Sequence, residues 1–122
     1  MPRRPAPLPV VRRLMKRLPG VTEVEAWGTP TWRAGKMFAM YENNHHRSGR
    51  VGIWIKAAPG NNEIMVAANP KAYYIPPYVG VGGWIGVRLD GTVDWDEVAE
   101  LLADGFRLVA PKKLVKELEG GR

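Results

Sequence analysis

The stretch from Tyr73 to Asp90 constrains the fold more than any other part of the chain. It reads Tyr-Tyr-Ile-Pro-Pro-Tyr-Val-Gly-Val-Gly-Gly-Trp-Ile-Gly-Val-Arg-Leu-Asp. The paired prolines predict a rigid turn, and the glycines after them allow the chain to change direction. From Trp84 onward apolar residues alternate with others, which predicts a strand that has one aliphatic face.

Hydrophobic periodicity divides the rest of the chain into helical ends and a run of short antiparallel strands between them. Asp94 and Glu97 have the spacing of a capping box, so we expect the most regular helix to begin there. We expect Asn62 to cap a shorter helix. The expected helices are 9–18, 62–68, 94–109 and 112–119, and the expected strands are 21–27, 31–34, 36–42, 50–57 and 84–90, with a polar hairpin loop at 43–49.

A chain of 122 residues with 45% apolar content is the size of one ordinary domain. We therefore expect a single domain over 1–122, with an ordered core at about 9–118. The absence of cysteine excludes disulfides and thiolate metal sites. No run reaches membrane-spanning length and prolines break the first residues, so the expected localisation is cytoplasmic.

The charge is strongly positive, with 18 Lys and Arg against 12 Asp and Glu. Such an excess favours polyanionic partners such as nucleic acid. On the expected first helix the face opposite the apolar residues carries only cations, and like charges four residues apart repel. This face is either one that an acidic ligand would neutralise or a solvated face of a packed helix. Its members are Arg12, Arg13, Lys16 and Arg17.

Two expected strands each place a tryptophan and a cation on the face opposite their aliphatic residues: Trp54 with Lys56, and Trp84 with Arg88. If the helices at both ends cover the aliphatic side, these residues would lie on an open sheet face. Indole rings beside cations can stack on bases and meet phosphates. The alternative is that neighbouring long side chains half-bury the tryptophans, as is common in two-layer domains.

Residues suited to catalysis or to metal binding are few. Ser48 is the single serine and shares an expected loop with both histidines, His45 and His46. Two adjacent histidines with no third ligand nearby make a weak metal site. The glycines at 80–83 precede a strand, so they lack the helix N-terminus on which phosphate loops depend. We therefore expect a protein that is not an enzyme and uses no cofactor and no metal.

Several motifs occur in an order that resembles the MmcQ/YjbR family, over the range from Val10 to Leu114. The resemblance implies an α/β (α+β) fold like that of frataxin and CyaY, a two-layer sandwich with one antiparallel sheet packed against the N- and C-terminal helices. It also implies DNA binding through a double-wing motif. The motifs are Trp27-Gly28-x-Pro30-x-Trp32, Gly35-Lys36-Met37-Phe38, Ala68-Asn69-Pro70, Pro76-Pro77-Tyr78, Gly83 to Asp90 and Leu108 to Leu114.

The resemblance and the charge pattern together predict a DNA-binding set. The expected partner is duplex DNA, bound by a monomer mainly through phosphates and with weak sequence preference. The alternative is a protein-interaction or small-ligand module that uses the loop from Tyr73 to Trp84 and the open sheet face. Iron binding, which a frataxin-like fold also suggests, is disfavoured because the first helix is basic where an acidic ridge is needed. The predicted DNA contacts are Arg12, Arg13, Lys16, Arg17, Lys36, Lys56, Trp84, Arg88, Lys112 and Lys113.

Overall fold

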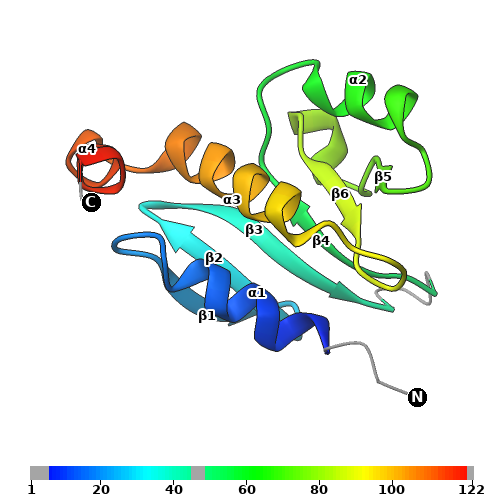
Figure 1. The fold of residues 1–122 in the computed structure, drawn as a ribbon, viewed down its shortest axis with the longest axis horizontal. Coiled ribbons are helices and arrows are strands. Elements are labelled where there is room, and N and C mark those ends of the chain that lie inside the picture. The colour runs from blue at the N-terminus through cyan, green and yellow to red at the C-terminus, as the bar shows by residue number, and fades with distance from the viewer. Residues whose placement is uncertain (1–5, 45–48, 121–122) are drawn as a thin grey trace.

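The computed structural model describes residues 6–44 and 49–120, and six strands among them form one sheet (Figure 1). Their order across the sheet is β1-β2-β3-β4-β6-β5, and every neighbouring pair is antiparallel. The predicted loop residues His45, His46 and Ser48 lie outside the described residues. The strands are β1 (Thr22–Ala26), β2 (Thr29–Ala34), β3 (Lys36–Asn43), β4 (Val51–Ile55), β5 (Tyr73–Tyr74) and β6 (Ile85–Arg88).

Helices from both ends of the chain lie along one face of this sheet. Helices α1 and α3 cover that face, and α4 lies beyond one end of the strands (Figure 1). The predicted α+β architecture is therefore confirmed. The helical elements are α1 (Pro7–Met15), α2 (Asn61–Ala68), the 3₁₀ turn η2 (Val79–Gly82), α3 (Trp95–Val109) and α4 (Lys112–Gly120).

The predicted caps have different outcomes. Asp94 precedes α3 and accepts a hydrogen bond from the Glu97 backbone N–H at 3.2 Å, as the capping box predicts. The prediction that Asn62 caps α2 is wrong, because the helix begins one residue earlier, at Asn61, after Gly60 in the left-handed conformation. A left-handed glycine can begin the helix without a side-chain cap.

Asn62 instead joins α2 to the loop before β6. Its side chain is buried, and its amide donates to the carbonyl oxygens of Gly80 at 3.1 Å and Trp84 at 3.0 Å. Buried amides of this kind need such partners. The residue that resembles a cap therefore fixes the glycine-rich loop against α2.

The main core fills the layer between the sheet and helices α1 and α3. Phe38 from β3 and Phe106 from α3 are fully buried and meet edge to face, with ring centroids 6.1 Å apart. The register between β2 and β3 shifts after Trp32, which leaves Phe38 as the extra residue of a β-bulge. The bulge turns Phe38 and its neighbour Ala39 toward the same core.

The opposite face of the sheet, called the distal face below, carries a second buried cluster. It consists of Met40, Trp54, Tyr74 and Trp84. Trp54 is 2% exposed and Trp84 is 8% exposed. The prediction that an open face displays these two indoles is therefore wrong, and the indoles are buried more completely than the half-buried alternative predicts.

Tyr74 covers the distal face because two glycines leave room for its ring. A Cβ on Gly86 in β6 would overlap the Tyr74 ring, and one on Gly52 in β4 would overlap the Tyr74 hydroxyl. Tyr74 is also the direct partner of Gly86 in the β5–β6 ladder. The ring therefore lies flat across β6 and β4 and seals the cluster beneath it.

Replacing Gly86 by Ala should lower the free energy of unfolding by about 1–3 kcal/mol, because overpacking a filled site costs about that much. Gly91→Ala is the matched control, since a Cβ there would meet nothing within 4 Å. Urea titration of both variants measures the difference. Equal unfolding midpoints would show that the Tyr74 ring does not rest on Gly86.

Candidate functional site

Three chain segments that carry predicted DNA contacts meet at one end of the molecule. A Cβ on Gly20, in the turn after α1, would lie 2.7 Å from the Leu114 side chain of α4. A Cβ on Gly35, between β2 and β3, would lie 3.5 Å from Pro111, just before α4. The three segments therefore lie side by side, at the left of Figure 1. They bring together five exposed cations, named the basic end: Lys16, Arg17, Lys36, Lys112 and Lys113.

The cations of the basic end have no carboxylate partner within 4 Å among the described residues. The four ion pairs found in residues 6–44 and 49–120 use other side chains. Two acids of α3 and α4, Asp104 and Glu119, are both held by Arg107 at 3.1 Å and 2.9 Å. The positive charge of the basic end is therefore left to solvent or to an external anion.

Arg12 differs from its neighbours on α1 because the fold neutralises it. Its guanidinium donates two hydrogen bonds to Glu23 of β1, from Nε at 3.0 Å and from Nη2 at 2.8 Å. The Arg12 hydrogen bond holds the pKa of the Glu23 carboxyl below its usual range. This ion pair joins α1 to β1, whereas Arg13, exposed on the same helix, has no carboxylate within 4 Å among the described residues. One cation of the row on α1 is thus paired within the fold, and the charge of the others remains available to solvent or to a ligand.

Three other predicted contacts, Lys56, Trp84 and Arg88, are not part of the basic end. Trp84 is buried, and its carbonyl oxygen accepts from Asn62, so its ring cannot stack on a base without unpacking the distal cluster. Lys56 lines a hollow of about 260 Å³ between β4, α2 and α3, beside Asp104. Arg88 is on the distal face, opposite the helices.

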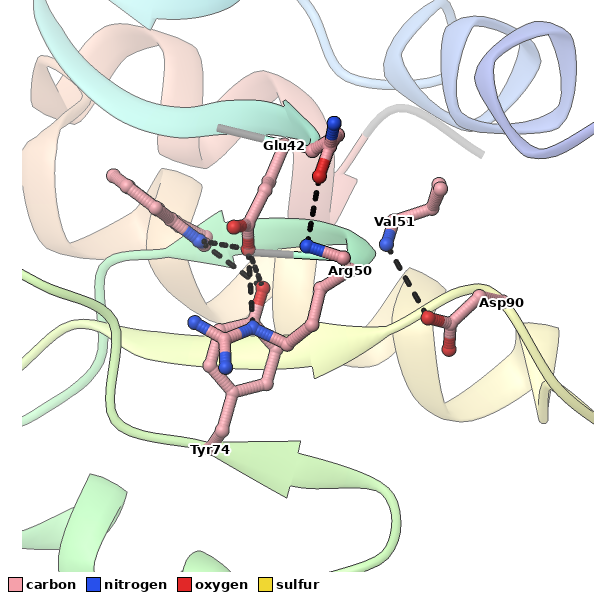
Figure 2. Close-up of polar contacts among 8 residues, drawn as sticks. Glu42, Arg50, Val51, Tyr74 and Asp90 are labelled. Atoms are coloured by element: carbon pink, nitrogen blue, oxygen red, sulfur yellow. Dashed lines mark hydrogen bonds and ion pairs between the residues drawn. The ribbon is translucent and has the colours of Figure 1, made fainter. Parts of the chain in front are cut away.

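The distal face holds a buried carboxylate, Glu42 of β3, which is 1% exposed. Its Oε1 accepts from the Trp54 indole Nε1 at 3.0 Å and from the Tyr74 hydroxyl, and the Arg50 Nε lies 3.6 Å away (Figure 2). The Trp54 Nε1 is also 3.1 Å from the Tyr74 hydroxyl oxygen. A buried charge requires such partners. This group was not predicted from the sequence, although a lone acid at the end of the apolar run 37–41 was a usable signal.

Two arginines lie over the same aromatic ring on this face. The guanidinium carbon of Arg50 is 4.3 Å from the centroid of the Tyr74 ring, and that of Arg88 is 5.3 Å from it. Both distances are within the range of cation–π attraction. These three residues, Arg50, Arg88 and Tyr74, are named the distal arginine site.

Comparison with known proteins places the chain in a family. The family model described as YjbR matches residues 16–108. The chain belongs to the YjbR family. The match includes three cations of the basic end and the whole distal arginine site, whereas Lys112 and Lys113 lie beyond it.

A solved structure has the same fold as this YjbR family member. It is the crystal structure of Deinococcus radiodurans protein DR2400, described with the family-model domain DUF419. The two share 24% sequence identity with a TM-score of 0.70, over 89% of this chain and 85% of that one. No curated protein matches the chain.

The described part of this YjbR family member has neither a membrane-spanning helix nor a cluster of metal ligands. Among residues 6–44 and 49–120, no helix is long and apolar enough to cross a membrane. Within the same ranges, no three His, Asp or Glu side chains gather as metal ligands would.

The environment of Tyr74 should make this YjbR family member less stable as the pH becomes alkaline. Burial, and then the hydrogen bond to Glu42, raise the pKa of the Tyr74 hydroxyl. A folded-state pKa above the unfolded value favours the native state at lower pH, and this stabilisation is lost as pH rises above about 10. Burial also raises the pKa of the Tyr41 hydroxyl, and burial followed by the nearby Glu97 raises the pKa of the Tyr73 hydroxyl.

Tyr74→Phe should lower the free energy of unfolding near neutral pH by about 1–3 kcal/mol, because Glu42 loses a donor. The variant should also lose less stability than the wild type between about pH 9 and pH 11, since one raised pKa is removed. Urea unfolding across that range measures both effects. Tyr73→Phe is the comparison, because its hydroxyl donates to the half-buried Glu97 and its loss should cost less. Unchanged neutral stability in Tyr74→Phe would contradict the role assigned to the hydroxyl.

Proposed function

We propose that this YjbR family member binds duplex DNA through the basic end, mainly by phosphate contacts and with weak sequence preference. The observation that carries the proposal is the convergence of five exposed cations from three segments, none with a carboxylate partner among the described residues. Four of the five are lysines, which act as flexible point charges rather than as rigid forks. Contacts of that kind hold the DNA backbone and carry little sequence information.

The proposed contact set is smaller than the one the sequence predicts. Arg12 is occupied by Glu23, Trp84 is buried, and Arg88 lies on the distal face. The MmcQ/YjbR resemblance, with its implied DNA-binding role, supports the choice of nucleic acid over other polyanions. DNA binding should therefore depend on α4 and the turns beside it rather than on the sheet.

Fluorescence anisotropy of labelled random duplex DNA across a salt series tests the proposal. Neutralising about four phosphates predicts a slope of log affinity against log salt near about −3.6. Lys112→Gln should make the slope shallower by about 0.9, because one phosphate contact is lost. Lys71→Gln is the control: Lys71 is exposed, and its replacement removes the same charge from the turn between α2 and β5, two elements that lie away from α4 (Figure 1).

Three results would contradict DNA binding at the basic end. The first is no binding at low salt, and the second is competition by heparin as strong as that by duplex DNA. The third is an equal change of slope in Lys112→Gln and Lys71→Gln, which would mean that net charge alone sets the affinity. A slope that changes only in Lys112→Gln supports the proposed surface.

A second candidate function is partner binding through the loop between β5 and β6. Tyr78 is the centre of a γ-turn, with φ 65° and ψ −64°, and the Val79 N–H donates to the Pro77 carbonyl oxygen at 2.6 Å. This turn is strained for a residue other than glycine. Tyr78 is 73% exposed and Val81 is 98% exposed. A strained backbone that presents exposed apolar side chains favours a contact surface.

Tyr78→Gly separates this candidate from DNA binding. Removing the strained side chain should raise the free energy of unfolding by about 1 kcal/mol, since glycine adopts a positive φ freely. The same change should abolish binding to a protein partner, and that binding should be insensitive to salt. Val24→Ser, at another exposed apolar position, is the control in affinity capture followed by mass spectrometry. Partners retained equally by both variants would count against the loop.

A further inference from the structure

We propose that the distal arginine site binds the phosphoryl group of a small phosphate ester, of the class of a nucleoside monophosphate. The site lies on the sheet face opposite α1 and α3. It shares no residue with the basic end. The inference therefore stands independently of DNA binding.

One arginine of the site lies in a central strand and the other lies next to one. Arg88 is in β6 directly opposite Gly52 of β4, and Arg50 immediately precedes β4. Both β4 and β6 have a hydrogen-bonded strand on each side. Sites built on such strands hold their geometry better than sites on loops.

The Tyr74 ring fixes the spacing of the two positive charges. Its hydroxyl is tied to Glu42 and Trp54, and its ring lies flat over Gly52 and Gly86. Arg50 and Arg88 both approach this one immobile ring, as Figure 2 shows for Arg50. Two like charges on one ring repel each other, and an anion between them would relieve that repulsion.

The charges within the site do not cancel, so the site can attract an anion. Glu42 lies beneath the ring and offsets the charge of Arg50, to which it is ion-paired. Arg88 has no carboxylate within 4 Å among the described residues. The cluster of Arg50, Arg88 and Glu42 thus has a net positive charge, and the excess lies on Arg88.

The guanidinium group selects the kind of anion. Its planar N–H donors match the oxygens of a phosphate or carboxylate in a bidentate geometry, which a lysine cannot reproduce. Two guanidinium groups on one ring suit a group that has several oxygens and up to two negative charges. A terminal phosphoryl group has both properties, whereas a carboxylate has a single charge and two oxygens.

The indole N–H of Trp54 offers a direct reporter, because it donates to Glu42 and lies beside the Tyr74 hydroxyl. Inorganic phosphate, adenosine 5′-monophosphate and adenosine should each be titrated into ¹⁵N-labelled protein at constant ionic strength. We expect a saturable shift of the Trp54 indole resonance with phosphate and with the nucleotide, and no shift with adenosine. A stronger response to the nucleotide would identify an ester as the ligand, and an equal response would identify free phosphate.

Arg88→Gln should weaken phosphate binding at least about tenfold, and Arg88→Lys should restore only part of it, because the fork is lost and the charge is kept. Lys71→Gln, which removes an exposed charge elsewhere, should bind as the wild type does. Lys112→Gln should also bind phosphate normally, so a failure of DNA binding and a failure of this site are distinguishable. The dispersion of the amide spectrum confirms that each variant is folded.

Three results would overturn the proposal. One is a shift that fails to saturate and that chloride reproduces at the same ionic strength. Another is an equal response to adenosine and its monophosphate, which would place recognition on the base. The third is unchanged phosphate affinity in folded Arg88→Gln.

Discussion

The packing of the distal face depends on the contacts that hold the buried carboxylate of Glu42. A buried acceptor that loses a hydrogen-bond donor typically costs about 1–3 kcal/mol, and more when the acceptor is charged. Here the partners come from separate parts of the chain: Trp54 from β4, Tyr74 from β5, and Arg50 from the residue before β4. The two-residue strand β5 is thereby anchored at the edge of the sheet by a side-chain network as well as by its backbone.

The same network explains the composition of the neighbouring strands. For the Tyr74 hydroxyl to reach Glu42, its ring must cross β6 and β4, and only glycine at positions 86 and 52 leaves the space. Once the ring lies there, Trp54 is sealed beneath it and two arginines find an aromatic surface above it. The contact between Tyr74 and the buried Glu42 therefore accounts for the two glycines, the buried tryptophan and the two cations around it.

Local patterns in the sequence predicted what depends on neighbours in the chain, and missed what depends on distant ones. The strand alternation and the Asp94 cap were predicted because each is set within a few residues. Asn62 has the composition of a cap, but the carbonyls that hold it come from the loop before β6. The burial of Trp54 and Trp84 depends on Tyr74, whose strand is too short to show periodicity. Lys16 and Arg17 were predicted to share one helix face, but only the fold shows that this face lies beside Lys36, Lys112 and Lys113.

The two positively charged surfaces differ in the way that their proposed ligands require. The basic end is mostly lysine on turns and helix ends, where mobile point charges can follow phosphates whose spacing varies, and bulk salt competes with them directly. The distal arginine site has two half-buried guanidinium groups, one from Arg88 on a central strand and one from Arg50 just before another, beside a ring that is itself hydrogen-bonded. Because its geometry is fixed before any ligand arrives, it can discriminate one small anion from another by shape, which the basic end cannot do.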